Sequence, residues 1–375
     1  MRSGIATVCL SGTLEDKLDA AARAGFDGVE IFENDLIASS LSPEAVRRHC
    51  AGLGLSVDLF QPFRDFEAVP GPLLTANLRR AEHKFDLMQR LGADTVLVCS
   101  SVSPDAVDDD DLAAEHLHAL AERAAARGLR VAYEALAWGR HVDTWRHAAE
   151  IVRRADHPAL GLCLDSFHVL SRGDDLTGLD AVGADKLFFL QLADAPDLRM
   201  DVLQWSRHHR LFPGQGAFDL AAFTGAVLDA GYRGPLSLEV FNDVYRQSAP
   251  DRAAVDAKRS LIALEERVAD RWESAGDGEH AAVPLGRLPR APELTGYAFA
   301  ELAVDDGTGP EVERTLAALG FAHVGQHRSK PVQLWQQGRA RVLVHSGGDR
   351  GTALNALAVD SADPARSARR AQALL

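Results

Sequence analysis

The hydrophobic and polar positions of the chain repeat in one pattern. An amphipathic helical segment ends in glycine, and a short apolar run that is typical of a strand follows. This pattern occurs five times, with the apolar runs at residues 28–32, 55–60, 95–100, 129–134 and 235–241. Glycine just after a helix can take the left-handed conformation that ends it, so the chain then turns back as a strand. Three further apolar runs bring the expected strands to eight: residues 4–10, 160–164 and 186–192.

Helical segments separate these strands. Ser42 followed by Pro43 is typical of a helix start, with a capping side chain and then proline in the first turn. Apolar residues recur at three- and four-residue spacing over residues 73–91 and 112–127, and residues 249–271 are expected to form the eighth helix. Eight strands that alternate with helices over roughly 270 residues predict an α/β fold, a closed (β/α)8 TIM barrel. An open doubly wound sheet is less favoured, because no Gly-x-Gly-x-x-Gly turn follows the first strand.

The pattern changes after the eighth helix. We expect the barrel to occupy residues 1–272 and a linker to follow at 273–293, where Gly, Pro, Ala and charged residues dominate without periodicity. Residues 294–375 then predict a smaller α+β domain in the order strand, helix and three strands (βαβββ), followed by one more strand and helix. The expected bounds of these elements are residues 296–304, 310–319, 322–328, 332–336, 341–345, 353–360 and 364–375.

The order of these elements resembles one module of the vicinal-oxygen-chelate superfamily, which includes relatives of hydroxyphenylpyruvate dioxygenase. Modules of that superfamily normally pair, and here only the first strand and helix of a second module follow. The resemblance therefore implies either that this polypeptide is a shortened piece of a longer one or that its dioxygenase-like second half-domain is incomplete. An unfinished sheet leaves an unpaired edge that needs a partner, so we expect a homo-oligomer formed through this domain.

Composition and charge restrict the kinds of molecule and compartment that we expect for this protein. The formal net charge is −14 and no Lys/Arg-rich run is present, so nucleic acid is not an expected partner. The four cysteines form no CxxC pair and lie in apolar or helical runs, which indicates reduced core residues and a cytoplasmic protein. The apolar run near the N-terminus is too short for a signal peptide, and no stretch approaches the length of a membrane span.

Polar side chains interrupt the hydrophobic runs at the carboxyl ends of four consecutive strands, where parallel barrel strands meet at one mouth. They are Glu134, Asp165, Gln191 and Glu239. Three carboxylates and an amide without counter-charge would repel one another, and one divalent cation resolves this. An oxygen-rich set without Cys or His favours Mg2+, Mn2+ or Co2+ over Zn2+. Any one of the four could instead be a structural acid in a salt bridge, but the shared position of all four favours a metal site.

Four further residues are expected near this mouth. His168 lies three residues after Asp165 and is the candidate catalytic base, because an imidazole titrates near neutrality; a supporting or loop role is the alternative. Arg64 follows the third strand and Arg210 follows the seventh, and each could hold a substrate carboxylate through its guanidinium fork or form a surface salt bridge. Ser206 could add a hydroxyl contact. The roles of three other polar residues stay open: Glu30, His208 and His209.

Residues 1 to about 270 resemble the xylose-isomerase-like sugar isomerase and epimerase barrels. The resemblance rests on the four strand-end residues, on Phe-Asp-Gly-Val-Glu-Ile-Phe at 26–32 and on Pro-Gly-Gln-Gly at 213–216. Within this group the sequence is most similar to the bacterial 3-dehydroshikimate dehydratases, some of which are fused to a dioxygenase-like C-terminal domain. The segments that support this are residues 30–35, 61–64, 133–139, 164–168, 191–195 and 206–210.

The resemblance implies a carbon–oxygen lyase with a divalent metal held by the four strand-end residues. The implied reaction converts 3-dehydroshikimate, a small anionic ring compound, to protocatechuate and water through a metal-chelated enediolate, in quinate or shikimate catabolism. A sugar or inosose isomerase or epimerase with the same metal site is the first alternative; the two arginines and the lack of phosphate-binding glycine turns favour the dehydratase. A barrel that only binds or scaffolds is less favoured because the metal-site residues are intact. A DNA-repair endonuclease would need more histidine ligands and a basic surface.

Overall fold

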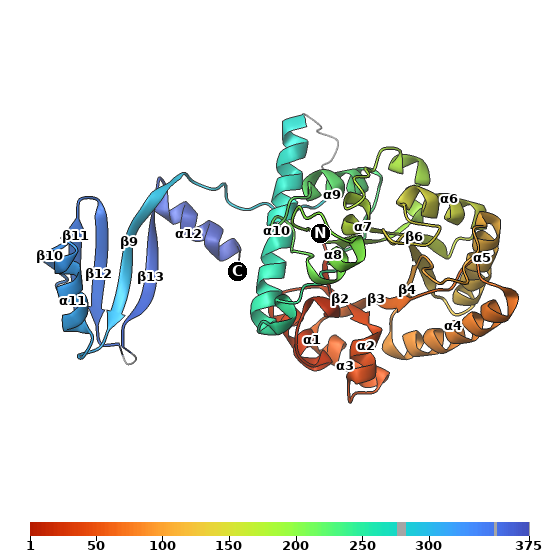
Figure 1. Ribbon diagram of the computed structural model, residues 1–375, viewed down its shortest axis with the longest axis horizontal. Coiled ribbons are helices and arrows are strands. Elements are labelled where there is room, and N and C mark those ends of the chain that lie inside the picture. Colours follow the sequence, from red (N-terminus) through yellow and green to blue (C-terminus); the bar gives the residue numbers. More distant parts are fainter. Residues whose placement is uncertain (276–282, 349–350, 375) are drawn as a thin grey trace. The chain divides into compact units, whose positions relative to one another are not determined.

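The computed structural model describes three stretches of the chain: residues 1–275, 283–348 and 351–374. They form two compact units, Met1–Arg287 and Leu288–Leu374 (Figure 1). The expected linker at 273–293 lies partly outside the described residues, since 276–282 fall within it. Its first residues continue the last barrel helix, α10 (Pro250–Ala275). The end of the last expected helix, at residue 375, also lies outside the described residues.

The first unit is a closed barrel of eight parallel strands in sequence order, which confirms the fold that the alternation of strands and helices predicted. Strand β1 pairs with β2 on one side and with β8 on the other, and this pairing closes the sheet. The strands are β1 (Ser3–Ala6), β2 (Gly28–Phe32), β3 (Ser56–Phe63), β4 (Thr95–Cys99), β5 (Arg130–Glu134), β6 (Leu160–Asp165), β7 (Leu187–Leu192) and β8 (Leu236–Leu238).

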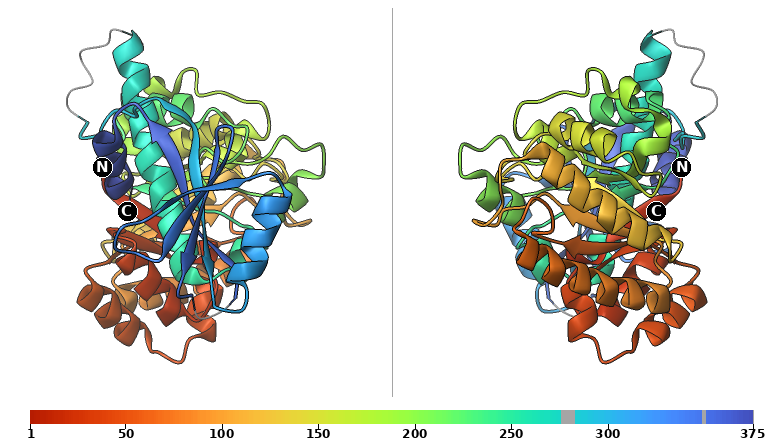
Figure 2. Two further views of the ribbon diagram at one scale, coloured as in Figure 1. Left: turned by 90° about the vertical axis from the view of Figure 1, so that its left-hand side faces the viewer. Right: turned by 90° about the vertical axis from the view of Figure 1, so that its right-hand side faces the viewer.

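Helices cover the outside of this barrel (Figure 1, Figure 2). Local sequence signals set their ends: the Ser42 side chain accepts a hydrogen bond from the N–H of Ala45 at the start of α3, as expected. Gly54 and Gly92 take φ angles of 77° and 84° just after α3 and α4, in the left-handed region. The helices before α10 are α1 (Leu14–Arg23), α2 (Glu33–Ala38), α3 (Pro43–Leu53), α4 (Gly71–Leu91), α5 (Asp110–Ala125), α6 (Trp145–Ala155), α7 (Ser166–Leu170), α8 (Val202–His208) and α9 (Leu220–Asp229).

An apolar cluster supports the strand ends from within the barrel. Ala132 and Cys163 belong to it, and they lie two residues before Glu134 and Asp165 on β5 and β6. Side chains two residues apart share one face of a strand, so the cluster lies directly beneath the polar residues. All four cysteines are buried and unpaired, as expected for reduced core residues. The cluster is formed by Leu59, Leu97, Cys99, Ala132, Leu136, Cys163 and Phe189.

The second unit is a five-stranded sheet in the order β10-β11-β12-β9-β13. Strand β12 runs parallel to β9 and the other neighbours are antiparallel, which confirms the predicted α+β arrangement. Strand β13, expected to open a second module, joins this sheet beside β9. Val304, Leu316, Trp335 and Val344 form a small core. The elements are β9 (Leu294–Val304), α11 (Gly309–Ala318), β10 (Ala322–Gln326), β11 (Val332–Gln337), β12 (Ala340–Ser346), β13 (Ala353–Ser361) and α12 (Pro364–Ala373).

Strands β9 and β13 expose large apolar side chains. They are Leu294, Tyr297, Leu354, Leu357 and Val359. The expectation that this unit needs a partner stays a prediction. Within the part of the chain that the structure describes, no helix has the length and apolar character needed to cross a membrane.

Candidate active site

The four residues predicted to bind a metal lie at the carboxyl ends of adjacent strands. Glu134 and Asp165 are the last residues of β5 and β6. Gln191 lies in β7, directly opposite Asp165 in the sheet register, and Glu239 follows β8. All four side chains are buried. The spacing of the strands therefore collects three carboxyl groups and one amide at a single end of the barrel, as the sequence predicted.

Arg210 lies among these residues and is itself buried. Its Nη1 atom donates to Asp165 Oδ2 at 2.7 Å and to Glu239 Oε2 at 3.1 Å. Its Nε and Nη2 atoms donate to Ser206 Oγ, at 3.2 Å and 2.8 Å. The structure thus brings the predicted residues Arg210 and Ser206 into the site. It also directs the Arg210 guanidinium at the protein's own carboxylates, which the sequence did not predict.

The segment that carries Arg210 is attached to the end of β7. Leu211 exchanges two backbone hydrogen bonds with Asp194, at 2.7 Å and 2.8 Å. The Asp194 carboxylate in turn accepts hydrogen bonds from the N–H groups of Gly214 and Gly216, at 2.9 Å and 3.0 Å. A side chain at Gly216 would collide with Asp194, which explains the glycine of the Pro-Gly-Gln-Gly motif. This motif therefore closes a loop that holds Arg210 over the strand ends.

Negative charge exceeds positive charge in this buried set. Burial raises the pKa of Glu134 well above its ordinary value, and the charges of Asp165 and Glu239 add to the shift. Burial also raises the pKa of Glu239 to about 7, against the attraction of Arg210. Burial would raise the pKa of Asp165 as well, but the charge of Arg210 holds it below its ordinary value. Glu134 Oε1 is buried and has no hydrogen-bond partner among the described residues. A divalent cation would relieve this repulsion, so the donor set fits a metal ion.

His168 lies in the first turn of α7, immediately after β6. The Asp165 carboxylate caps this turn by accepting hydrogen bonds from the N–H groups of Phe167 and His168. One donor atom each of Glu134, Asp165 and His168 lie within 4.8 Å of one another, close enough to hold one metal ion together. The expectation against Zn2+ rested on a set without histidine, and this cluster contains one. The argument from ligand type against zinc is therefore weaker than the sequence indicated.

Both ring nitrogens of His168 face hydrogen-bond donors. The N–H of Ala137 donates to His168 Nδ1 at 3.0 Å, and Arg210 Nη2, which can only donate, lies 3.2 Å from His168 Nε2. Burial lowers the pKa of His168 to about 3, despite the charge of Asp165, and the ring is therefore neutral near pH 7. A neutral ring has a lone pair on one nitrogen only, so it accepts from one of these two donors at a time. The Nε2 atom lies 4.0 Å from Glu134 Oε1 and 3.9 Å from Asp165 Oδ2.

Two other arginines line the small cavity beside these groups. Arg64 is the residue predicted from the sequence. Arg207 was not predicted, because it lies on a short helix and not at the end of a strand. The Arg207 guanidinium stacks over the Phe241 ring, 5.3 Å from its centre. Burial lowers the pKa of Arg207, and the charge of Arg64 adds to this, so the two cations lie close to each other. A pair of adjacent cations favours an anion between them.

The two histidines whose roles were open lie outside this cavity. His208 is exposed and its Nδ1 atom lies 3.0 Å from Asp243 Oδ2. His209 pairs through its backbone with Asn242. Both contacts link α8 to the segment that follows β8, so these histidines hold the loop and do not line the cavity.

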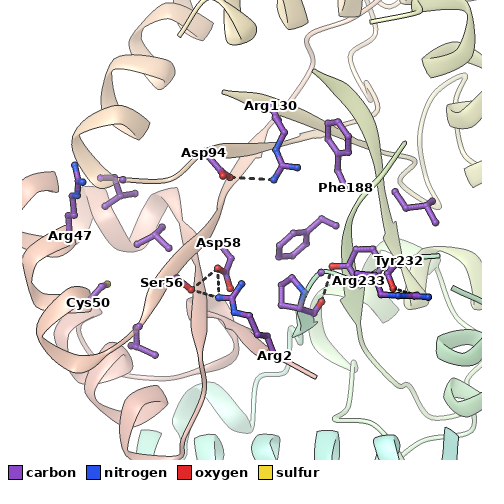
Figure 3. A pocket seen from close by; sticks show the side chains of 18 of the residues that line it. Arg2, Arg47, Cys50, Ser56, Asp58, Asp94, Arg130, Phe188, Tyr232 and Arg233 are labelled. Carbon is purple, nitrogen blue, oxygen red and sulfur yellow. Dashed lines mark hydrogen bonds and ion pairs between the residues drawn. The ribbon is translucent and has the colours of Figure 1, made fainter. Parts of the chain in front are cut away.

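A much larger cavity lies at the opposite, amino-terminal end of the strands. Its volume is about 690 Å3, whereas the cavity beside Glu134 measures about 10 Å3. Figure 3 shows that Arg2 reaches Asp58 and that Arg130 reaches Asp94 across its wall. Each of these acids has its own arginine, and the Asp58 side chain is 10% exposed with its Oδ2 atom buried. The carboxyl end differs because three buried carboxyl groups lie beside one arginine, Arg210.

Two curated proteins match most of the chain. The chain is 56% identical over 348 residues to the 3-dehydroshikimate dehydratase of Pseudomonas aeruginosa and 52% identical over 349 residues to that of Pseudomonas putida. Each match covers 92% of this chain and 54% of the relative, so the chain spans about half the length of these curated relatives.

A solved structure shares the fold throughout. It is titled a xylose isomerase-like TIM barrel/4-hydroxyphenylpyruvate dioxygenase fusion protein and is 50% identical, with a TM-score of 0.91 over 100% of this chain and 62% of that one. The family described as xylose isomerase-like TIM barrel matches residues 18–264, which is most of the first unit. The chain therefore belongs to the xylose isomerase-like TIM barrel family.

Proposed function

We propose that the chain catalyses the metal-dependent dehydration of 3-dehydroshikimate to protocatechuate, a step of quinate or shikimate catabolism. The observation that carries this proposal is the buried set of three carboxyl groups and an amide at the strand ends, closed by Arg210. The high identity to the two bacterial dehydratases over nearly the whole chain supports the choice of substrate.

Four residues would hold the metal: Glu134, Asp165, Gln191 and Glu239. A bound divalent cation polarises the ring ketone of the substrate and makes the neighbouring C–H proton acidic. The oxygen-rich donor set favours Mg2+, Mn2+ or Co2+. Glu134 has a buried oxygen without a hydrogen-bond partner among the described residues and a raised pKa, so it is suited to accept that proton at Oε1.

His168 stays a candidate base in this proposal, the role expected from the sequence. Its ring is neutral, so it can take up a proton on the nitrogen that holds the lone pair, Nδ1 beside Ala137 or Nε2 beside Arg210. It is not a general acid in this state, because a neutral imidazole that gives up its N–H proton becomes an imidazolate anion. The proton taken from carbon leaves with the departing hydroxyl group as water.

Arg64 and Arg207 bind the substrate carboxylate. Both guanidinium groups line the cavity and neither forms an ion pair among the described residues at the distances that define one. Arg210 is bound to Asp165 and Glu239, so it holds the carboxylates in place and is less free to bind the substrate than the sequence suggested.

The direct test supplies metal-stripped protein with 3-dehydroshikimate and Mg2+, Mn2+, Co2+ or Zn2+ in turn. The expected result is the ultraviolet spectrum of protocatechuate with at least one of the first three ions. No aromatic product with any ion would contradict the proposal. A parallel arm with inosose tests the isomerase alternative, which predicts a changed substrate without aromatic product.

The role of His168 is tested by two substitutions. We expect His168→Ala to retain metal binding and to lower turnover by about 10²- to 10⁴-fold, the usual contribution of a general acid or base. His168→Gln keeps an N–H donor and has no group that titrates near neutrality. If His168 acts only through hydrogen bonds, His168→Gln is faster than His168→Ala; if it takes up the proton, the two variants are equally slow.

A further inference from the structure

The segment that carries Arg64 has an unusual backbone. Residues 64–68, which we call the Arg64 segment, follow β3 and form neither helix nor strand. Asp65 and Ala68 take φ angles of 56° and 52°, in the left-handed region that residues with a side chain rarely adopt. Such a conformation costs free energy and persists only where surrounding contacts enforce it. The contacts of this segment therefore decide where Arg64 lies in the cavity beside Glu134.

Glu67 holds the Arg64 segment through a buried carboxyl group. Its Oε1 atom accepts hydrogen bonds from the N–H of Ser101 at 2.6 Å and from the hydroxyl group of Tyr133 at 3.0 Å. Ser101 lies two residues after the end of β4, and Tyr133 lies next to Glu134 in β5. Glu67 thus connects the segment that carries Arg64 to the strand that carries Glu134.

Other contacts hold the Arg64 segment to elements that are closer in the sequence. Asp65 Oδ1 accepts a hydrogen bond from the N–H of Val102 at 3.0 Å. Asn77 Nδ2, on α4, donates to the carbonyl oxygens of Asp65 and Phe66 at 2.8 Å and 3.1 Å. These contacts reach α4 and the loop after β4. The hydrogen bonds of Glu67 add β5 to the support of the segment.

Packing alone does not account for a carboxyl group at position 67. Among the described residues no arginine or lysine forms an ion pair with Glu67, and its Oε2 atom is buried without a partner. Burying such a group costs more free energy than burying an apolar side chain of similar size. Glu67 does not line the cavity beside Glu134, so it does not touch a substrate there. The cost is explained if the connection between the Arg64 segment and β5 serves the site.

We propose that Glu67 is a positioning residue, which fixes the Arg64 guanidinium relative to Glu134 and so sets the place of the substrate carboxylate. The proposal deepens the proposed function and rests on it in one respect, the binding of that carboxylate by Arg64. A substrate that binds at both points must match the distance between Arg64 and the strand ends. An arginine that is already held in place loses less conformational freedom when it binds the ligand, so the substrate binds more tightly.

The first test measures KM and kcat for 3-dehydroshikimate in two variants. Glu67→Met keeps the length of the side chain and removes its acceptor oxygens. We expect KM to rise about 10-fold with kcat within about threefold, because Arg64 binds the substrate and the transition state alike. Glu67→Gln is the matched control. Its amide oxygen can accept both hydrogen bonds, since an NH2 group in that place would meet the N–H of Ser101, and KM should stay within about threefold.

A double-mutant cycle with Arg64→Ala separates positioning from general damage. Arg64→Ala removes the group that Glu67 is proposed to position, so adding Glu67→Met should then raise KM by less than about threefold. Damage to the barrel would instead raise KM by the same factor in both backgrounds. Calorimetry should show unchanged Mn2+ binding in Glu67→Met, because the substitution alters none of the proposed metal ligands. Equal factors in the two backgrounds, or a loss of Mn2+ binding that parallels the rise in KM, overturn the proposal.

Tyr133→Phe keeps the proposal testable if Glu67→Met does not fold. The substitution removes one of the two hydrogen bonds to Glu67 and leaves the aromatic ring in the core. KM should rise by about two- to fivefold, as expected for the loss of one hydrogen bond, and this rise should also disappear in the Arg64→Ala background. A KM equal to that of the unchanged chain overturns the proposal.

A readout without turnover distinguishes failure of this proposal from failure of the proposed function. In protein labelled with 15N-arginine, the Arg64 Nε signal is assigned by its loss in Arg64→Ala. The signal should shift in Glu67→Met and keep its position in Glu67→Gln. If the unchanged chain forms no protocatechuate, the proposed function fails, and the Arg64 signal then tests the positioning by itself. A signal that stays unchanged in Glu67→Met overturns the proposal.

Discussion

The two ends of the barrel carry the same kind of ion pair in opposite surroundings. At the carboxyl end Arg210 meets Asp165 at 2.7 Å, with side chains 1% and 0% exposed. At the amino end Arg2 meets Asp58 at 2.9 Å, with side chains 52% and 10% exposed (Figure 3). Water screens the second pair and hardly reaches the first. The end that we propose for the chemistry has the smaller cavity, and buried charge without full compensation is what distinguishes it.

Glu239→Ala gives the largest expected effect and tests the carboxyl end directly. It removes one of the three carboxylates proposed to bind the metal, so turnover should fall by at least about 10³-fold, as when a group that acts in the transition state is lost. Metal binding, measured by calorimetry, should be lost in the same variant. If turnover survives, the metal assignment is wrong.

Arg210→Met should destabilise the metal-free protein strongly. The substitution leaves Asp165 and Glu239 buried without their cation, and breaking a buried pair in this way costs about 3–5 kcal/mol. The measurement is urea unfolding at pH 7. Added Mn2+ should recover part of the loss, because the metal replaces the missing positive charge and binds the folded state. A loss below about 1 kcal/mol would show that groups other than Arg210 balance the charges of Asp165 and Glu239.

Local signals in the sequence were sufficient to predict the barrel fold. The glycines at 54 and 92 and the Ser42 cap act within one helix end, so their effect can be read without tertiary structure. The positions of Glu134 and Asp165 at strand ends were also predictable, since both residues interrupt apolar runs, and their role as metal ligands stays a prediction.

The supporting contacts were not predictable from these signals. The hydrogen bond between Glu30 and Gln191 joins residues 161 positions apart, and nothing local to either residue specifies it. The direction of the Arg210 guanidinium depends on how the loop after β7 is attached to Asp194. The ring nitrogens of His168 face donors from two distant segments, the N–H of Ala137 and the Nη2 atom of Arg210. Such contacts are set by three-dimensional packing and not by periodicity.

Glu67→Gln tests how a buried carboxyl group outside the proposed metal set affects the pH dependence of stability. Glu67 Oε1 accepts hydrogen bonds from the N–H of Ser101 and from the hydroxyl of Tyr133, while Oε2 is buried without a partner among the described residues. Burial raises the pKa of Glu67 to about 7. The folded state thus keeps this proton at pH values where the unfolded chain has lost it.

The sign of the resulting pH effect follows from this difference. Between about pH 4.5 and pH 7 the folded state binds the proton of Glu67 and the unfolded state does not, so the free energy of unfolding falls as pH rises. The loss amounts to about 3 kcal/mol across this range. Unfolding measured at pH 4.5 and pH 7.5 should show that loss in the unchanged chain relative to Glu67→Gln. Equal pH dependence of the two proteins would contradict the assignment.

Arg2→Met gives the smallest expected effect and completes the comparison with Arg210→Met. The substitution is the same, and so is the kind of partner, but Arg2 is half exposed and Asp58 keeps its hydrogen bond from Ser56 once the pair is broken. We therefore expect the free energy of unfolding to fall by less than about 1 kcal/mol, with turnover unchanged. The loss should shrink further at high salt, because screening weakens an exposed pair first. If Arg2→Met instead destabilised the protein as much as Arg210→Met, burial would not be what distinguishes the two ends, and the large cavity would need a function of its own.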